Sequence, residues 1–458
     1  MRVIVAGAGR VGESIARYLV RAGHEVTAID QRPELVQRIS ETVDLRAIVG
    51  SASHPAVLRE AGAANADLLV AVTRSDEVNI VACQVANALF KTATRIARIR
   101  QQAYLDRRWE DLFARQHLAV DVVISPEIEV ARSVARTLLV PGSLAVIPFA
   151  RDQARLVSVR CDPDCPILDT PLRQLSFLFP DLHVVVVAIE RNDRLFVPHS
   201  EDRLLSGDRA WFVVETKQQA RALTAFGHEP YQGRRVVIGG AGSIGRFLVQ
   251  ELRNIAPQVR LTVLENDPER AGSLAEDEPD VIVLKGDARD PDLLREAGVE
   301  TVDTFVTVTN QDEVNIMSAL MAKRLGANRT LALVNTDSYA PLISDIGIDV
   351  MIDPRGTTVS SILQHVRRGR ILAGFSIKDG AAEAIEADLP ENSPLVGKPL
   401  EKGRLPHGVI IGAVLREGQY IVPRPDTVLR ARDRLIAIAR GDQIKSLEQA
   451  VAVRFDYL

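Results

Sequence analysis

The strongest constraint on the fold of this chain is an internal duplication of its sequence. Residues 3–12 match residues 236–245, and three more segments recur in the same order. These further pairs are 26–30 with 261–265, 58–62 with 294–298, and 73–79 with 309–315. The offset between the copies changes only from 233 residues (240 minus 7) to 236 residues (312 minus 76). We infer a duplication with a small insertion near residues 254–258, so that both halves adopt one fold.

Each copy alternates short β-branched runs with helical patterns. In the first copy we predict strands at 3–6, 26–30, 68–72 and 95–99, and helices at 10–22 and 78–89. Strands that alternate with helices form βαβ units, whose parallel sheet is covered by helices on both faces. The predicted fold class is therefore α/β, with two Rossmann-like doubly wound parallel-sheet domains.

A different kind of segment follows each of these domains. Residues near 140–225 and 370–458 contain few long helical patterns and show short apolar runs separated by turn residues, such as Asn192-Asp193 and Glu417-Gly418. We predict a small α+β domain after each Rossmann-like domain, reached through linkers at 138–144 and 366–371. The four predicted domains cover residues 1–137, 138–228, 229–368 and 369–458.

A glycine motif lies where the first strand of each copy becomes a helix. In the first copy the motif is Gly7, Gly9 and Gly12. The first glycine makes the tight turn, the second lets the backbone approach a pyrophosphate, and the third lets the helix pack closely on its strand. The free amide groups and the dipole at such a helix start attract phosphate. The second copy repeats the motif with Gly240, Gly242 and Gly245.

An acidic residue accompanies each motif. Asp30 and Glu265 end the second strand of their copies, about 20 residues after the glycines, where a carboxylate can bind both ribose hydroxyls. A 2′-phosphate would lie against this carboxylate, so NADP is disfavoured. The pattern leaves NAD(H), ATP and ADP open as ligands. The alternative interpretation is a glycine turn kept for packing after the ligand was lost, and it carries more weight in the second copy.

One feature separates the two copies. Arg98 and Arg100 leave a strand on the same face, because side chains alternate along a strand, and two guanidinium groups there could bind extra phosphate charge. The matching residues of the second copy are Leu333 and Asn335. We expect the first site to accept the more highly phosphorylated ligand. The alternative is that both arginines form surface or interface ion pairs.

Further residues at strand ends complete the predicted sites. Asp76 and Asp312 each open a helix, either as N-terminal caps or as part of the nucleotide cleft, and the turns at 50–51 and 286–287 are expected to border the adenine. The full predicted site of the first copy is Gly7, Ala8, Gly9, Arg10, Val11, Gly12, Asp30, Gln31, Ser51, Ala52, Thr73, Arg98 and Arg100. The full predicted site of the second copy is Gly240, Gly242, Ser243, Ile244, Gly245, Glu265, Asp287, Ala288 and Thr309.

The composition argues against other kinds of partner. The chain has a net charge of −4, only 4% aromatic residues and no basic block, so nucleic acid is not an expected partner. No apolar run reaches the ~18 residues that span a bilayer, so we do not expect the chain itself in a membrane, although it could dock on a membrane protein. Cys83, Cys161 and Cys165 fit neither a disulfide framework nor a zinc site, and no metal is expected.

An NAD-dependent dehydrogenase is the main alternative interpretation of the glycine motifs. Such an enzyme needs a proton relay beside the nicotinamide. The sequence has no Tyr four residues before a Lys, no H-E-x-x-H motif, no G-x-S-x-G motif and no Walker A loop. We therefore predict that the chain is not an enzyme and has no catalytic residues.

The four-part arrangement resembles the TrkA proteins, which contain two RCK (regulator of K⁺ conductance) modules in one chain. The resemblance covers essentially the whole chain and rests on residues 3–12, 58–63, 69–73 and 76–86. The duplicated domain order is its specific part, because a Rossmann motif alone occurs in many unrelated proteins. One departure is Gly50-Ser51-Ala52, where many relatives have a more polar run.

This resemblance implies a cytoplasmic protein, peripheral on the inner face of the inner membrane. It implies a ring, expected to be a homotetramer, beneath a Trk-type potassium-translocating membrane subunit. It also implies binding of NAD(H) and of ATP or ADP, with basic residues such as Arg98 and Arg100 near the phosphates. Apolar helical residues at 81–89 are expected to pack between Rossmann domains. A second alternative is an RCK-like ligand sensor for a different membrane transporter.

Overall fold

The computed structural model describes residues 1–105, 107–113, 117–178, 183–228, 235–339, 346–366, 371–378, 380–401 and 405–451. The chain forms two compact units, each assembled from segments that are distant in sequence. The first unit contains Met1–Glu129, Arg355–Ala387 and Gly441–Ala452, and the second contains Val130–Pro354 and Asp388–Arg440. Each unit therefore joins parts of both sequence copies.

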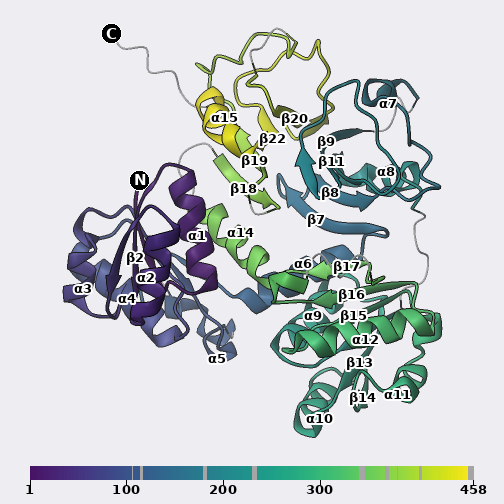
Figure 1. The fold of residues 1–458 in the computed structure, drawn as a ribbon, viewed down its shortest axis with the longest axis horizontal. Helices are drawn as coiled ribbons and strands as arrows, with labels where there is room; N and C mark the ends of the chain where they lie inside the picture. Colours follow the sequence, from purple (N-terminus) through teal and green to yellow (C-terminus); the bar gives the residue numbers. More distant parts are fainter. Residues whose placement is uncertain are drawn as a thin grey trace. The chain divides into compact units, whose positions relative to one another are not determined.

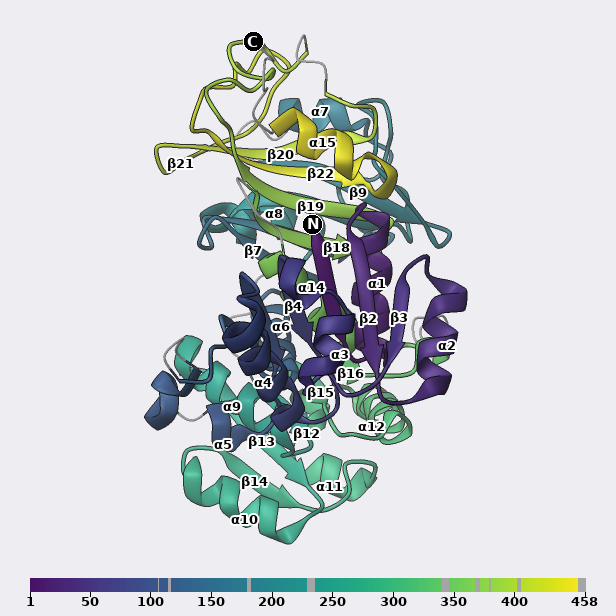
Figure 2. The same ribbon diagram turned by 90° about the vertical axis from the view of Figure 1, so that its left-hand side faces the viewer.

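The first unit opens with a six-stranded parallel sheet in the order β3-β2-β1-β4-β5-β6 (Figures 1 and 2). Helices α1 and α2 pack on one face, and α3 and α4 pack on the other. The strands are β1 (Arg2–Ala6), β2 (Glu25–Asp30), β3 (Arg46–Val49), β4 (Leu68–Ala71), β5 (Thr94–Arg98) and β6 (Val122–Ile124). The helices are α1 (Arg10–Arg21), α2 (Pro33–Thr42), α3 (Pro55–Glu60), α4 (Asp76–Val85) and α5 (Gln102–Leu105), whereas α6 (Pro126–Leu138) follows the sheet in sequence but belongs to the second unit from Val130 onward.

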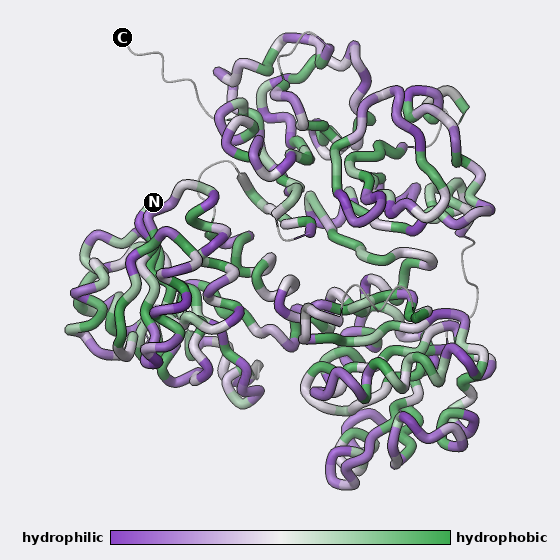
Figure 3. The backbone as a smooth tube through the Cα atoms, viewed as in Figure 1, coloured by the Kyte–Doolittle hydropathy of each residue, from purple (hydrophilic) through white to green (hydrophobic). Residues whose placement is uncertain are grey.

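The second unit contains the matching sheet of the second copy, in the order β14-β13-β12-β15-β16-β17 and again fully parallel. Its strands are β12 (Arg235–Gly239), β13 (Arg260–Glu265), β14 (Ile282–Lys285), β15 (Thr304–Thr307), β16 (Arg329–Leu333) and β17 (Val350–Ile352). Its helices are α9 (Ser243–Ile255), α10 (Pro268–Asp277), α11 (Pro291–Glu296) and α12 (Asp312–Leu325), whereas α14 (Pro354–Val366) follows the sheet in sequence but belongs to the first unit from Arg355 onward. The central strands β4 and β15 are buried along their whole length, as helices on both faces require, and hydrophobic residues are frequent in both sheets (Figure 3).

Each parallel sheet is followed in sequence by a small module built on a five-stranded sheet with antiparallel pairing. The strand orders are β10-β9-β11-β8-β7 and β18-β19-β22-β20-β21. The first module consists of β7 (Ser143–Phe149), β8 (Ala154–Arg160), α7 (Leu172–Leu178), β9 (Val184–Arg191), β10 (Arg194–Phe196), β11 (Arg209–Glu215) and α8 (Gln219–Ala225). The second consists of β18 (Ile371–Ile377), β19 (Ala382–Asp388), β20 (Val409–Arg416), β21 (Gln419–Ile421), β22 (Arg434–Arg440) and α15 (Ile444–Val451).

Two helices exchange their packing partners between the copies. The helix α14 follows the second sheet in sequence, yet its buried residues Val359, Ile362 and Leu363 belong to the apolar core of the first sheet, beside α1. Conversely, Val134 and Leu138 of α6 belong to the core of the second sheet. The exchange explains why each compact unit contains both sequence copies.

The structure confirms the predicted fold class of two Rossmann-like parallel sheets, each followed by a small α+β module. The predicted strands correspond to β1, β2, β4 and β5. The linker predicted at 138–144 coincides with the end of α6 and the start of β7. Most of the linker predicted at 366–371 lies outside the described residues, as do the predicted boundaries at 228–229 and 368–369. The division into four domains at those positions stays a prediction.

One difference between the copies is visible in the backbone. After α4 the chain makes a π-helical turn over Ala86–Phe90 and ends at Lys91 in the left-handed conformation (φ 56°). The matching helix α12 has no such turn and ends at Gly326 (φ 114°). The offset between copies falls here from 236 (309 minus 73) to 235 (329 minus 94), so the π turn accommodates one extra residue.

Candidate nucleotide-binding sites

The first glycine motif has the backbone geometry of a phosphate-binding loop. Gly7 follows β1 with φ 110°, which a side chain would resist, and its amide donates to the carbonyl of Ile29 at 2.7 Å. A Cβ atom on Gly12 would overlap the carbonyl oxygen of Gly7, so only glycine fits there. A Cβ atom on Gly9 would meet nothing within 4 Å. The space in front of Gly9 is therefore available to a ligand.

The helix that follows this loop begins without a capping side chain. Gly9 is the N-cap residue of α1 and can offer no side-chain acceptor to the first amides of the helix. By contrast, Ser75 caps α4, Asp267 caps α10 and Asp290 caps α11, each through a side-chain oxygen. The start of α1 is thus suited to an external anion, which would complement its dipole.

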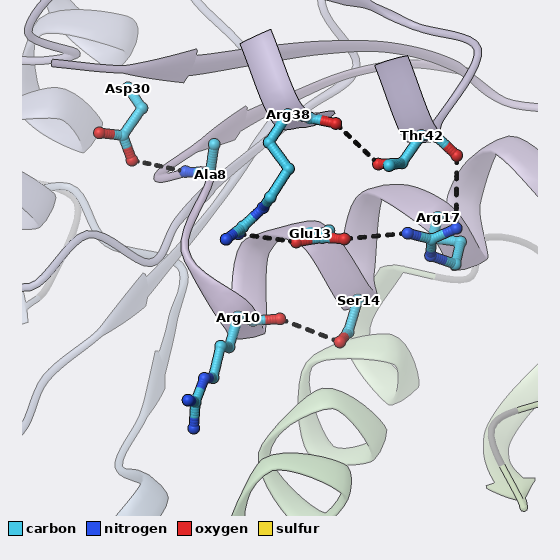
Figure 4. A network of polar contacts seen from close by, with 8 residues as sticks. All are labelled: Ala8, Arg10, Glu13, Ser14, Arg17, Asp30, Arg38 and Thr42. Atoms are coloured by element: carbon cyan, nitrogen blue, oxygen red, sulfur yellow. Dashed lines mark hydrogen bonds and ion pairs between the residues drawn. The ribbon is translucent and has the colours of Figure 1, made fainter. Parts of the chain in front are cut away.

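The carboxylate of Asp30 closes onto the glycine loop (Figure 4). Its Oδ2 atom accepts the amide of Ala8 at 2.7 Å, and its Oδ1 atom accepts the amide of Arg32 at 3.0 Å. Each carboxylate oxygen has further lone pairs, so these bonds orient the group and still leave it able to accept hydrogen bonds from a ligand. The predicted ribose partner therefore lies directly beside the predicted phosphate loop.

The first turn of α1 is held by a charged network on the other side of the loop (Figure 4). Glu13 accepts from Arg17 at 2.9 Å and from Arg38 of α2 at 2.8 Å. Arg17 also donates to the carbonyl of Thr42 at 3.3 Å. This network joins α1 to α2 and fixes the helix whose start forms the loop.

The second glycine motif repeats the backbone geometry. Gly240 has φ 107°, a Cβ atom on Gly245 would overlap the carbonyl oxygen of Gly240, and Gly242 again faces open space. The carboxylate of Glu265 accepts the amide of Ala241 at 2.6 Å. The two loops therefore have the same construction down to the loop amide that binds the acidic residue.

The second carboxylate is held more tightly than the first. The Oε1 atom of Glu265 accepts both the amide of Asp267 at 2.8 Å and the guanidinium of Arg270 at 2.9 Å. Its side chain is only 5% exposed, against 13% for Asp30. Asp30 forms a longer ion pair with Arg32, whose Nε atom is 3.7 Å away. A ribose at the second site would share the carboxylate with a close cation.

The predicted arginine pair of the first copy divides into two different roles. Arg100 forms an ion pair with Glu127 at 2.8 Å, as the alternative interpretation expected. Arg98 instead donates from Nη2 to the carbonyl of Thr73 at 3.1 Å, and within the described residues its buried Nε has no hydrogen-bond partner. The structure thus leaves guanidinium capacity at Arg98 beside the end of β4.

The electrostatic surroundings of Arg98 favour an additional anion. Burial lowers the pKa of Arg98, and the charge of Arg100 lowers it further, whereas Glu127 and Asp76 oppose this effect. A guanidinium whose pKa is depressed is one whose positive charge is incompletely compensated. In the second copy Leu333 is buried at the position of Arg98, and Asn335 donates to Asp312 at 2.9 Å and 3.0 Å.

A buried asparagine that sequence reasoning missed joins two strand ends in each copy. Asn79 accepts the amide of Thr73 at 2.9 Å and donates to the carbonyl of Arg98 at 2.9 Å. Asn315 repeats both bonds with Thr309 and Leu333. Both asparagines belong to the repeated segments 73–79 and 309–315, which was the available signal. They position the strand ends that border the predicted clefts.

Asp76 and Asp312 lie in the first turn of their helices, where they compensate the dipole, and they also make contacts that neither prediction described. Ser75, not Asp76, is the N-cap residue of α4. Asp76 instead accepts the amides of Arg100 and Gln101 at 2.9 Å and 2.7 Å, which fixes the chain after β5. Burial acts to raise the pKa of Asp312, but hydrogen bonds from Asn335 and Thr336 outweigh it, so the pKa lies below the ordinary value.

The residues expected to border the adenine are occupied by local contacts. Ser51 is buried and its hydroxyl lies 2.8 Å from that of Ser53, whereas Asp287 forms a close ion pair with Arg289 at 2.6 Å. The hydrogen bond from Arg289 lowers the pKa of Asp287. The other predicted residues divide by exposure: Ala52 and Ala288 are buried, Val11 and Ile244 pack against their cores, and Gln31 and Arg10 are exposed.

The fold and these loops define a protein with two Rossmann-like domains, each with a glycine loop suited to phosphate and each followed by a small α+β module. Residues 3–126 and 236–354 match the TrkA-N domain family, and residues 156–227 and 384–452 match the TrkA-C domain family. The chain therefore belongs to the TrkA family, which confirms the resemblance drawn from the sequence.

Individual relatives agree along the full chain. The Trk system potassium uptake protein TrkA of Azorhizobium caulinodans is 46% identical over 100% of both chains. The TrkA protein of Halomonas elongata is 37% identical over 95% of both chains, and a TrkA homolog of Archaeoglobus fulgidus is 32% identical over 98% of this chain and 99% of its own.

Solved structures share the fold at low sequence identity. The GsuK RCK domain is 18% identical, with a TM-score of 0.60 over 99% of this chain and 95% of that one. The GsuK channel bound to NAD has the same identity and TM-score, over 99% of this chain and 79% of that one. Among the helices in the described ranges, none is both long and apolar enough to cross a bilayer.

Proposed function

We propose that this chain is a nucleotide-sensing regulatory subunit that gates a Trk-type potassium-translocating membrane protein. The observation that carries the proposal is the pair of glycine loops, each open in front of its second glycine and each faced by a carboxylate. Membership of the TrkA family supports potassium uptake as the process. The chain would act from the cytoplasmic face of the inner membrane, as a peripheral component of the transporter and not as an enzyme.

The proposed ligands are NAD(H) and ATP or ADP. The carboxylates Asp30 and Glu265 suit a ribose with free 2′- and 3′-hydroxyls, which all these nucleotides contain. A fold neighbour, the GsuK channel, has been solved bound to NAD. Charge divides the sites: we assign the more highly phosphorylated nucleotide to the first copy, where Arg98 and Arg100 lie at the end of β5.

The physical basis of sensing is a difference in affinity. A nucleotide can shift an assembly between two shapes only as far as its binding free energy differs between them. ATP and ADP differ by one phosphate, so the site that separates them needs a cation where the last phosphate lies. Arg98 has unused guanidinium capacity and Arg100 is half-exposed, which makes this pair the proposed discriminator.

Isothermal titration calorimetry tests the proposal. The purified chain should bind ATP, ADP and NAD, and the Arg98→Ala/Arg100→Ala double variant should lose about tenfold or more in ATP affinity while ADP affinity changes less. Arg289→Ala is a matched control, because it removes an arginine from an ion pair in the second copy. If the ratio of ATP affinity to ADP affinity is unchanged in the double variant, the two arginines do not discriminate between these nucleotides. If the unaltered chain binds no nucleotide at all, the proposed sensor function is wrong.

We further propose a symmetric ring, a homotetramer, as the working assembly. Val81 and Leu89, on α4 and the π turn, are exposed by 43% and 59%, and Met317 at the position of Val81 in the second copy is exposed by 50%. Exposed apolar side chains at matched positions are suited to a repeated contact between copies. Light scattering at micromolar concentration should give a tetramer mass, and a monomer would contradict the ring.

Two experiments separate this proposal from its alternatives. The chain should co-purify with the Trk-type membrane subunit encoded by the same organism. If it captures only another transporter, it is instead an RCK-like ligand sensor for that transporter. Incubation with NADH and a panel of oxo acids should show no turnover. Clear substrate-dependent NADH consumption would instead establish a dehydrogenase.

A further inference from the structure

The helix that begins at the first glycine loop ends against the second C-terminal module. The hydroxyl of Tyr18, on α1, lies 2.7 Å and 2.8 Å from the two carboxylate oxygens of Glu383 on β19. Glu383 is 1% exposed, so its carboxylate depends on protein partners in place of water. All these residues belong to the first compact unit.

Two further points of α1 approach the same module. A Cβ atom on Gly23, just after the helix, would lie 2.6 Å from the ammonium of Lys445 on α15. A Cβ atom on Gly380, just before β19, would lie 3.9 Å from a guanidinium nitrogen of Arg21. The end of α1 therefore lies close to the second module at Arg21 and Gly23 as well as at Tyr18.

The helix between these two ends is firmly packed. Ile15 and Leu19 are fully buried in the same apolar cluster as Ile362 and Leu363 of α14. At its start, Glu13 binds Arg17 and Arg38, which fixes α1 against α2. A continuously hydrogen-bonded helix in a close-packed core moves as one body, so a shift of the loop displaces Tyr18 as well.

The matching helix of the second copy has different contacts. Glu251 of α9 stands at the position of Tyr18 (251 minus 18 equals the offset of 233) and lies 4.0 Å from Arg132 of α6. Arg155 of β8 stands where β19 has Glu383, and it binds Asp152 and Gln219 inside its own module. The connection from nucleotide loop to C-terminal module through a tyrosine and a buried carboxylate is thus a property of the first loop.

We propose that α1 transmits the state of the first nucleotide site to the second C-terminal module, through the hydrogen bond of Tyr18 to Glu383. This inference rests on the proposed nucleotide-sensing function. According to this inference, the module that responds to the first site is the one furthest from it in sequence. The module that directly follows the first sheet, residues 138–228, is not the receiver of this contact.

Hydrogen–deuterium exchange with mass spectrometry tests the assignment on the full chain. Saturating ATP, compared with nucleotide-free protein, should change the exchange of the β19 amides at 382–388 as well as that of the glycine loop. Tyr18→Phe keeps the ring and removes the donor. It should bind ATP within about threefold of the unaltered chain by calorimetry, and its β19 response should fall by half or more. Glu383→Met removes the acceptor at similar side-chain length, should give the same loss, and provides a second route if Tyr18→Phe folds poorly.

A tyrosine of the second copy provides the matched control. Tyr339 donates to Glu313 at 3.2 Å, so Tyr339→Phe removes a similar bond elsewhere and should leave the β19 response intact. A full β19 response in both Tyr18→Phe and Glu383→Met would overturn the inference alone. Nucleotide binding without any β19 response in the unaltered chain would do the same. Absence of nucleotide binding in the unaltered chain would overturn the proposed function together with the inference.

Discussion

At the carboxyl edges of the two parallel sheets, the first copy has arginine at four positions where the second has none. Arg10, Arg74, Arg98 and Arg100 correspond to Ser243, Asn310, Leu333 and Asn335. The backbone of the two glycine loops is nevertheless the same, including the amide that binds the acidic residue. The duplicated scaffold has kept its loop geometry and changed its charge, which is the property that distinguishes one phosphorylated ligand from another.

The largest effect on stability should come from substitution of Gly12, which packs against the carbonyl group of Gly7. Gly12→Ala places a Cβ atom on the carbonyl oxygen of Gly7, so the loop must open and the first unit should lose about 3 kcal/mol or more of unfolding free energy. Gly9→Ala meets no protein atom and should keep its stability while losing nucleotide affinity. Chemical denaturation and calorimetry separate the two. Equal stability loss in both variants would contradict the assigned roles.

The next effect compares the two carboxylates. Glu265→Ala removes bonds to Ala241, Asp267 and Arg270, and leaves Arg270 with only the longer ion pair to Asp267 at 3.9 Å, so it should cost about 2–3 kcal/mol of stability. Asp30→Ala removes two amide bonds and should cost about 1–2 kcal/mol. Urea denaturation measures both costs. If Asp30→Ala is the more destabilising variant, Glu265 does not contribute more than Asp30 to the stability of its loop.

Asp312 should make the stability of the second copy sensitive to acid. Its folded pKa lies below the unfolded value of 3.8, so its contribution to stability is present above pH 3.8 and is lost as pH falls through the lowered pKa. Asp312→Asn should therefore lower the melting temperature near neutral pH, and its gap from the unaltered chain should narrow below about pH 4. Circular dichroism melts from pH 3 to 7 measure this gap, with the exposed Asp280→Asn as control. A gap independent of pH would contradict the assignment.

The smallest effect concerns the helix ends that follow α4 and α12. Lys91 adopts a left-handed backbone where the second copy has Gly326, and a side chain is disfavoured in that conformation. Lys91→Gly should stabilise the first unit by up to about 1 kcal/mol, less the extra entropy of glycine in the unfolded chain. Gly326→Ala should destabilise the second. Stabilisation by both variants would show that the backbone conformation is not what separates them.

Much of the site could be predicted because the relevant residues are close in sequence. Gly7 makes the tight turn, Gly9 leaves open space for a ligand, and Gly12 lets the helix pack closely on its strand. These three roles follow from the spacing of the glycines and need no contact with distant residues. Asp30 follows from the length of one helix and one strand. The binding of nucleotides by these residues stays a prediction, but their mutual placement is a consequence of local geometry.

Other features depended on contacts between distant residues. Asn79 recurs as Asn315 in the repeated segments, but its role could not be read from them, since it comes from a bond to the end of β5 nineteen residues later. Arg98 and Arg100 alternate as predicted, but Glu127 at the start of α6 engages Arg100 and leaves Arg98 with its unused capacity. Ser75 precedes Asp76 and takes the capping role, because its side chain reaches the amide of Val78.

By itself, the sequence determined the duplication, the two parallel sheets, the glycine loops and the acidic residue beside each loop. These follow from periodicity and short-range stereochemistry, which act alike in both copies. Only the tertiary structure decided that α6 and α14 exchange partners, and that α1 ends against Glu383. The physical reason is that an apolar helix face specifies that it must be buried but not against which sheet. Two similar sheets in one chain offer two similar surfaces, and specific contacts such as Arg329 donating to the carbonyls of Thr137 and Val140 hold the observed choice.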